Sequence, residues 1–154
     1  MKKMKSSALF IKLQKHMEKY KSKVKHNELS FNEEDMSIEN IMSKYNLETY
    51  YEIINSSYGE LDDEVNEDEL KDLKNRIDNY FRLYAPDDEE FREFIKIISL
   101  YLIFIAKKPL HPPGIKFSNG TMVYKKDDIF YCTGKKVFIK DELSLCKYCI
   151  ARIN

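Results

Sequence analysis

Residues 88–106, DEEFREFIKIISLYLIFIA, are expected to form the core helix of the protein. From Ile97 to Ala106 nearly every side chain is apolar, so a helix here presents apolar groups in all directions. A helix with that composition has to be buried on most sides. The apolar run is much shorter than the roughly 20 residues that span a bilayer. We therefore expect other helices of the same protein, and not a membrane, to surround it.

Apolar residues recur at helical spacing in three other stretches, which are residues 6–25, 38–58 and 68–84. This spacing predicts amphipathic helices whose apolar faces meet the central helix. Before the second of them, Ser30 or Asn32 is suited to cap a helix N-terminus, and a bend is expected near Asn46. The acidic stretch GELDDEVNED, residues 59–68, reads as the clearest loop.

Prolines mark both ends of the central helix. Pro86 ends the preceding helix, Asp87 is expected to cap the central one, and Glu90 completes a capping-box pattern. After the helix, KKPLHPPG at residues 107–114 contains three prolines. Because proline has no N–H and restricts the residue before it, the helix cannot continue through this turn.

The pattern changes after the proline-rich turn. Thr121–Tyr124 and Ile129–Cys132 are β-prone runs on either side of four polar residues, which predicts a β-hairpin. Val137–Ile139 is a candidate third strand. Asp141 is suited to cap a final short helix that would carry the last two cysteines.

These patterns predict a mainly α-helical fold, with four to six helices packed round a buried helix at about 88–106 and a small C-terminal β-hairpin. A chain of 154 residues is expected to form a single domain, 1–154. Within it, the helical part covers about residues 6–106, and a small subdomain carrying cysteines and a histidine covers about 107–154.

The charge of the chain is zero in total but falls into three blocks. Residues 1–26 hold nine lysines and one glutamate, residues 27–93 hold 21 acidic and six basic residues, and residues 94–154 hold eleven basic and four acidic residues. One interpretation is that the basic ends fold against the acidic middle or form solvated faces. The other is that they bind an anionic partner such as nucleic acid.

All three cysteines of the chain lie within its last 23 residues, behind a histidine in the proline-rich turn. Cys146 and Cys149 form a C-x2-C pair, whose spacing lets both sulfurs turn toward one ion. Cys132 and His111 would complete a set of three thiolates and one imidazole, which is a known structural zinc set. Thiolates select zinc or an iron–sulfur cluster over magnesium or calcium. We expect zinc, with an iron–sulfur cluster as the alternative.

These residues also have other interpretations. A single cysteine is most often a small buried hydrophobe, and His111 can be an exposed loop histidine. An open three-cysteine site could hydrolyse a substrate with help from Asp141 or Glu142. Thioredoxin-like chemistry is not expected with only five residues after Cys149, and the zinc-deaminase motif is absent. The pattern leans away from an enzyme without deciding the matter.

Three stretches of the C-terminal half carry a family likeness. They are FREFIKIISLYLIFIAKKPLHPPGIKF (91–117), GTMVYKKDDIFYC (120–132) and LCKYCIARIN (145–154). Together they resemble an uncharacterised archaeal family found in methanogens, uncharacterised protein family 0305 or domain of unknown function 2115. The likeness covers roughly residues 80–153.

The family pattern is a buried helix ending in an AKKPxHPxG-like turn, a tyrosine–cysteine hairpin end and a terminal CxxC followed by Ile-Ala. It often has proline after the hairpin cysteine, where this chain has Thr133. The resemblance implies an archaeal cytoplasmic protein, and it implies one site formed by His111, Cys132, Cys146 and Cys149. It implies no particular activity.

The leading hypothesis is a non-enzymatic, zinc-stabilised helical domain with a structural or macromolecule-binding role. The first alternative is a nucleic-acid-binding protein that uses the lysine-rich segments 2–25 and 107–147, and the second is a metal-dependent hydrolase. An odd cysteine count without a secretion signal indicates reduced thiols. A cytoplasmic location without a membrane partner is therefore expected.

Overall fold

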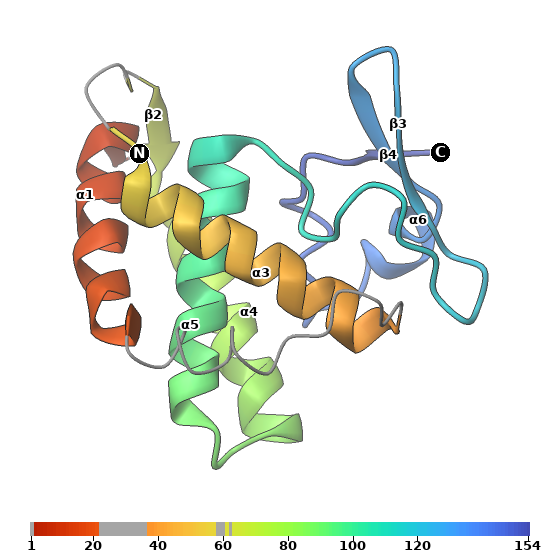
Figure 1. Ribbon diagram of the computed structural model, residues 1–154, viewed down its shortest axis with the longest axis horizontal. Helices are drawn as coiled ribbons and strands as arrows, with labels where there is room; N and C mark the ends of the chain where they lie inside the picture. The colour runs from red at the N-terminus through yellow and green to blue at the C-terminus, as the bar shows by residue number, and fades with distance from the viewer. Residues whose placement is uncertain (1, 22–36, 58–60, 62) are drawn as a thin grey trace.

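The central element of the fold is α5 (Glu89–Leu100), which continues as the π-helical segment η2 (Tyr101–Ala106). The computed structural model describes residues 2–21, 37–57, 61 and 63–154. Every side chain from Ile97 to Phe104 is buried, and α5 runs through the middle of the helical part (Figure 1). The expected buried helix is confirmed. No helix within the described ranges combines the length and the apolar character needed to cross a membrane.

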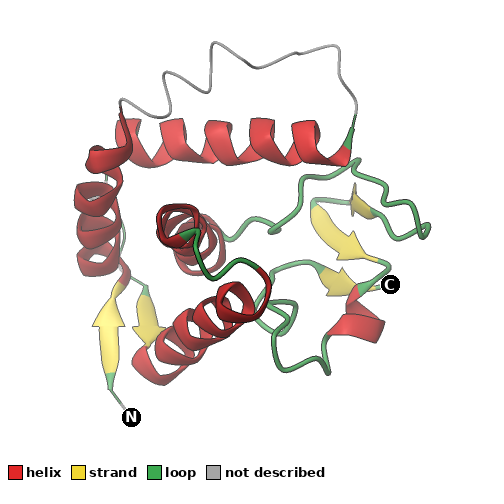
Figure 2. Cartoon of the chain, turned by 90° about the horizontal axis from the view of Figure 1, so that it is seen from below, coloured by secondary structure: helices red, strands yellow, loops and turns green. Residues whose placement is uncertain are grey.

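Three other helices lie around α5 (Figures 1 and 2). They are α1 (Ser6–Met17, followed by the 3-10 turn η1, Glu18–Tyr20), α3 (Ile38–Asn55) and α4 (Glu67–Tyr84). Their apolar faces join α5 in one core cluster, in which Phe10, Ile53 and Leu73 are almost completely buried. A short helix, α6 (Lys135–Phe138), lies in the C-terminal part. The mainly helical fold is therefore confirmed for the described residues.

The cap of α5 differs from the expected one by a single residue. Asp88, and not Asp87, accepts a hydrogen bond from the Phe91 N–H at 3.3 Å. Asp87 instead forms the corner of the turn that begins at Pro86. At the far end the backbone of Lys107 turns left-handed, with φ of 56°, and the prolines stop the helix as expected.

The bend expected at Asn46 is wrong, because α3 is one continuous helix. The helix contains neither glycine nor proline, and an interior asparagine costs well under about 1 kcal/mol. Ser37 caps it by accepting from the Asn40 N–H at 3.2 Å. The other candidate caps, Ser30 and Asn32, lie outside the described residues.

A small antiparallel sheet was not expected from the sequence. β1 (Lys3–Lys5) pairs with β2 (Glu64–Asn66), which lies inside the stretch predicted as a loop. Val65 of β2 is 3% exposed and belongs to the core. Its burial helps to keep β2 in place against the helices. Asn66 then caps α4, accepting from the N–H groups of Asp68 and Glu69.

The C-terminal part contains the predicted hairpin. β3 (Val123–Lys126) pairs antiparallel with β4 (Ile129–Cys132) through a turn at Asp127 and Asp128, which both have positive φ. That geometry matches the right-handed twist of a tight hairpin. A third strand, β5 (Arg152–Ile153), pairs parallel with β4.

Two expectations for the C-terminal part are wrong. Val137–Ile139 is not a strand, because this segment belongs to α6 and its end. The helix expected after Asp141 is a series of turns. There the carbonyls of Asp141 and Ser144 accept hydrogen bonds from the Arg76 guanidinium. In a helix, these carbonyls would instead accept from backbone N–H groups of the following turn.

Candidate metal centre

The four predicted ligands reach one place from separate segments of the chain. His111 lies in the turn after η2, Cys132 ends β4, and Cys146 and Cys149 lie in the C-terminal turns. All four line one small cavity of about 30 Å³. The rest of its wall consists of Pro109, Leu110, Val123, Lys135 and Ala151. Topology therefore brings together residues up to 38 positions apart in the sequence.

Lining the same cavity does not by itself give the four side chains the geometry of a metal-coordination sphere. In the described parts of the chain, no group of three or more His, Cys, Asp or Glu side chains is arranged so that it could hold a metal ion. The three cysteines are free thiols. The cavity has room for one water-sized occupant. The zinc clip thus stays a prediction, and the space favours a single ion over an iron–sulfur cluster.

Burial is the largest cause of the pKa shifts of two groups at the cavity, His111 and Cys146. It lowers the pKa of His111, which keeps a neutral imidazole with a free lone pair. It raises the pKa of the Cys146 thiol, and negative charge on Cys149 or Cys132 acts in the same direction. A hydrogen bond from Ser144 and the charge of Lys135 oppose that rise. The net rise favours the neutral thiol at Cys146, and a cation bound beside it would favour the thiolate instead.

Two features suit the site to thiolate sulfur. The Leu110 N–H donates to Cys149 Sγ at 3.5 Å, a bond of the kind that tunes sulfur ligands. Lys135 lies in the cavity wall, where its Nζ donates to the carbonyls of Cys149 and Ala151 at 2.7 Å each. Three thiolates and a neutral imidazole around Zn²⁺ carry one negative charge, which this ammonium would balance.

Sequence reasoning missed Lys135. It is one of many lysines near the C-terminus, and its spacing from the cysteines carries no motif. Only the placement of α6 beside the cavity shows it. Tyr45 of α3 was missed for the same reason: its hydroxyl donates to the carbonyl of Pro109 and fixes the turn that precedes His111.

The residues suggested for hydrolysis do not join the site. Asp141 and Glu142 are exposed, and neither is among the residues that line the small cavity. Asp141 Oδ1 accepts from the Leu143 N–H at 2.8 Å, which is a local turn contact. Neither carboxylate is therefore placed to act as an acid or base beside the cysteines.

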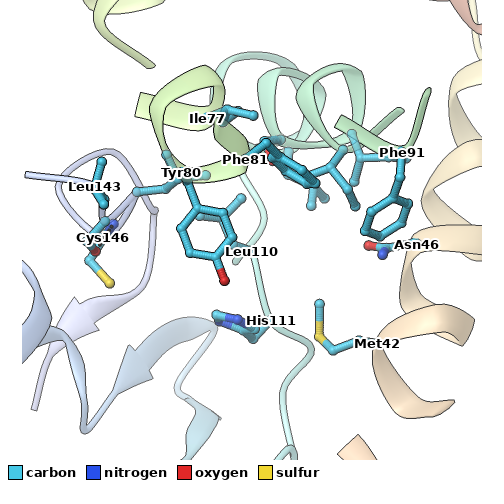
Figure 3. A pocket seen from close by; sticks show the side chains of 16 residues that line it. Met42, Asn46, Ile77, Tyr80, Phe81, Phe91, Leu110, His111, Leu143 and Cys146 are labelled. Carbon is cyan, nitrogen blue, oxygen red and sulfur yellow. Dashed lines mark hydrogen bonds between the residues drawn. The ribbon is translucent and has the colours of Figure 1, made fainter. Parts of the chain in front are cut away.

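The C-terminal cysteine pair is held in place by α4. Arg76 donates to the carbonyls of Asp141 and Ser144 at 3.2 and 2.9 Å, and the Tyr148 hydroxyl donates to Asp72. The Cys146 N–H donates to Ser144 Oγ at 3.0 Å. Figure 3 shows His111 and Cys146 on separate segments. Because the bonds from Arg76 and to Asp72 hold the turns that carry Cys146, the position of Cys146 depends on the packing of these turns against α4.

The fold and the cysteine–histidine cluster define a small helical protein with a C-terminal thiol site. Comparison with known sequences then gives the family: residues 1–154 match the family described as "Uncharacterized protein conserved in archaea (DUF2115)". The chain belongs to that family.

Several relatives come from methanogenic archaea. The UPF0305 protein MJ0646 of Methanocaldococcus jannaschii is 40% identical over 112 residues, which are 72% of this chain and 68% of the relative. A UPF0305 protein of Methanococcus maripaludis is 35% identical over 106 residues, or 68% of this chain and 64% of the relative. One from Methanothermobacter thermautotrophicus is 30% identical over 83 residues, or 53% of this chain and 51% of the relative. The matched regions thus leave a third or more of two of these relatives uncovered. No solved structure is similar to the chain.

Proposed function

We propose that this chain is a non-enzymatic, zinc-stabilised helical domain whose metal fastens the C-terminal turns to the hairpin. The observation that carries the proposal is that His111, Cys132, Cys146 and Cys149 all line the same cavity of about 30 Å³. Zinc prefers four nitrogen and sulfur ligands in structural sites, and a bound metal contributes directly to folding free energy.

A structural role follows from the donor set and its surroundings. Four protein ligands would fill a tetrahedral zinc site and leave no open position for a substrate. Asp141 and Glu142 lie outside the cavity wall, so the hydrolase alternative lacks the two carboxylates suggested for it. Free thiols also suit a reducing, cytoplasmic environment, which is part of the same proposal.

Metal analysis of the full chain tests this directly. We expect about one zinc per chain when the protein is made in zinc-supplemented medium, and less after Cys149→Ser or Cys132→Ser. A chelator should lower the melting temperature of the native sequence, because a ligand that binds only the folded state stabilises it. The spectrum should lack the visible absorption of an iron–sulfur cluster.

Histidine variants supply the matched control. His111→Gln should lower zinc content, whereas His16→Gln should leave it unchanged because His16 is exposed on α1. Circular dichroism shows whether each variant keeps its helices. A metal-free native protein whose melting is indifferent to the chelator would refute the proposal.

A second candidate, nucleic-acid binding, is favoured by one observation. Tyr124 and Tyr131 stack with ring centroids 5.3 Å apart and planes at 21°. They alternate along the strands with Val123 and Cys132, which face the small cavity, so the stack lies on the opposite face of the sheet. Arg152 pairs in register with Tyr131. Stacked aromatics beside cations are typical of surfaces that bind single strands.

Other contacts support the simpler interpretation of the basic ends. Lys3 pairs with Glu64 at 3.5 Å and Lys108 with Glu52 at 2.8 Å, so both basic blocks contact the acidic middle. Fluorescence anisotropy with a short single-stranded RNA separates the two interpretations. Binding that weakens with salt and is lost in Tyr131→Leu but not in Tyr84→Leu supports the candidate, and salt-independent binding ends it.

A further inference from the structure

A second and larger cavity adjoins the cysteine–histidine cluster. Its volume is about 450 Å³, and His111 and Cys146 belong to its wall as well as to that of the small cavity. The other walls come from α3, α4, α5 and the C-terminal turns (Figure 3). This volume falls within the range of about 300–1,000 Å³ that is usual for small-molecule sites.

The wall of the large cavity carries no charge. Among the described residues that line it there is no aspartate, glutamate, lysine or arginine. In the whole chain, these four residue types make up 34% of the sequence. Burying an ionised molecule without a partner charge is strongly unfavourable. The occupant that the cavity suits is therefore neutral.

Aromatic rings form one side of the cavity. Tyr80, Phe81 and Phe91 follow one another edge to face, with centroid separations of 5.8 and 5.9 Å. Tyr80 and Phe91 are 47% and 46% exposed, so they place large apolar surface at the entrance as well as inside. Such a wall favours ring-containing or otherwise apolar compounds.

Uncharged polar groups are few, and several of them gather toward the thiol site. In Figure 3 the Tyr80 hydroxyl points toward His111, with Cys146 to one side. Asn46 contributes an amide from α3. A few polar groups in an apolar wall orient a ligand that carries a single hydrogen-bonding group.

We propose that this cavity binds a neutral, largely apolar small molecule, with its one polar group toward His111 and the Tyr80 hydroxyl. The inference goes beyond the zinc proposal and does not depend on it, because the volume, the uncharged wall and the rings are properties of α3, α4 and α5 as much as of the cysteine cluster. The ligand would lie next to the small cavity, in contact with two of the four candidate metal ligands.

Two fluorescent probes with the same ring skeleton test the proposal. N-phenyl-1-naphthylamine is neutral, and 8-anilinonaphthalene-1-sulfonate adds one negative charge. The chain of residues 1–154 should enhance the fluorescence of the neutral probe saturably and bind the anionic probe at least about tenfold more weakly. Equal binding of both probes would indicate a nonspecific apolar surface and overturn the proposal, as would no binding of the neutral probe.

Cavity-filling variants locate the probe. Leu143→Trp and Met42→Trp each place a bulky ring in the wall from opposite sides, and each should weaken binding of the neutral probe by about tenfold or more. Val137→Trp adds the same ring at a residue that is 71% exposed on α6 and should leave binding unchanged. Two filling variants guard against the failure of one to fold, which circular dichroism reveals. If both fold and both bind as the native protein does, the cavity is not the site.

Discussion

Arg76 joins the helical part of the molecule to the turns that carry Cys146 and Cys149. Its guanidinium donates to two carbonyls of those turns while its Nε contacts Asp72 at 3.0 Å. The side chain is only 16% exposed; its bond to the Ser144 carbonyl is partly buried, and its bond to the Asp141 carbonyl is exposed. A planar group with several fixed donors suits this task better than a single ammonium.

Arg76→Lys is therefore expected to lower the free energy of unfolding by about 1–3 kcal/mol, because carbonyls bonded to the guanidinium lose their donors. Urea unfolding followed by circular dichroism measures the change. Arg82→Lys, at an exposed position of the same helix, is the control and should change stability by less than about 0.5 kcal/mol. Equal effects from the two variants would mean that Arg76 does not hold the C-terminal turns.

Asp72 makes the stability of the molecule depend on acid. The hydrogen bond from Tyr148 holds the pKa of this carboxyl below its ordinary value, and Arg76 acts in the same direction while burial opposes both. Because the folded pKa is lower than the unfolded one, the unfolded chain binds more protons in between. The stabilisation is present above about pH 4 and is lost as the pH falls through the folded pKa.

Tyr148→Phe should reduce this acid dependence, since it removes the main cause of the lowered pKa of Asp72. The free energy of unfolding of the native protein should fall more steeply than that of the variant between about pH 4 and pH 3. The Asp72 side chain is 42% exposed, so the difference will be small. Tyr84→Phe, at a tyrosine that is 68% exposed, should keep the native acid slope. The same slope in Tyr148→Phe would contradict the assignment.

At the scale of elements, Gly134, the residue that precedes α6, packs closely against Thr121, which lies two residues before β3. A β-carbon added at Gly134 would lie 2.5 Å from Cγ2 of Thr121, a distance that real contacts do not show. The backbone of Gly134 has φ of −88° and ψ of −15°, which any residue adopts. Close packing, and not backbone conformation, therefore requires glycine at this position.

Gly134→Ala is expected to destabilise the protein by about 1–3 kcal/mol through this overpacking. Thr121→Ser removes the clashing methyl group, so the double variant Thr121→Ser with Gly134→Ala should recover part of the loss. A double-mutant cycle in urea measures the coupling. Strictly additive effects would show that the two residues are not in contact.

At the scale of the whole molecule, the C-terminal part shares the core of the helical part. Leu110, Leu145 and Tyr148 pack against the main hydrophobic cluster. Lys108 Nζ also donates to both carboxylate oxygens of Glu52, at 3.0 and 2.8 Å. The hairpin subdomain thus has much of its apolar surface covered by another part of the chain.

The two parts should consequently unfold together. The chain has no tryptophan, so Phe130→Trp in β4 supplies a unique fluorescence reporter of the C-terminal part, while circular dichroism reports the helices. We expect coincident urea transitions from the two probes, as a single cooperative domain requires. A fluorescence transition at clearly lower urea would instead show that the subdomain unfolds alone.

Much of this architecture could be predicted because local patterns determine it. The composition of residues 97–106 requires burial, the prolines after Lys107 require a stop, and two β-prone runs around Asp127 and Asp128 require a hairpin. The wrong predictions concern segments whose conformation is set by contacts with residues far away in the sequence. Examples are β2, which exists by pairing with β1, and the turns after Asp141, whose carbonyls bond to Arg76.

The helical class and the C-x2-C pair could be predicted from the chain alone, because apolar periodicity and cysteine spacing are local properties. The family, and support for grouping His111 and Cys132 with that pair, followed from the resemblance of the C-terminal half to known sequences. The folded molecule was needed to show that His111, Cys132 and the C-terminal pair line one small cavity, that Lys135 lies beside them, and that a cavity without charged residues in its described wall adjoins them. Those facts depend on how α4, α6 and the C-terminal turns pack. Packing brings together residues whose separation along the chain follows no recognisable pattern.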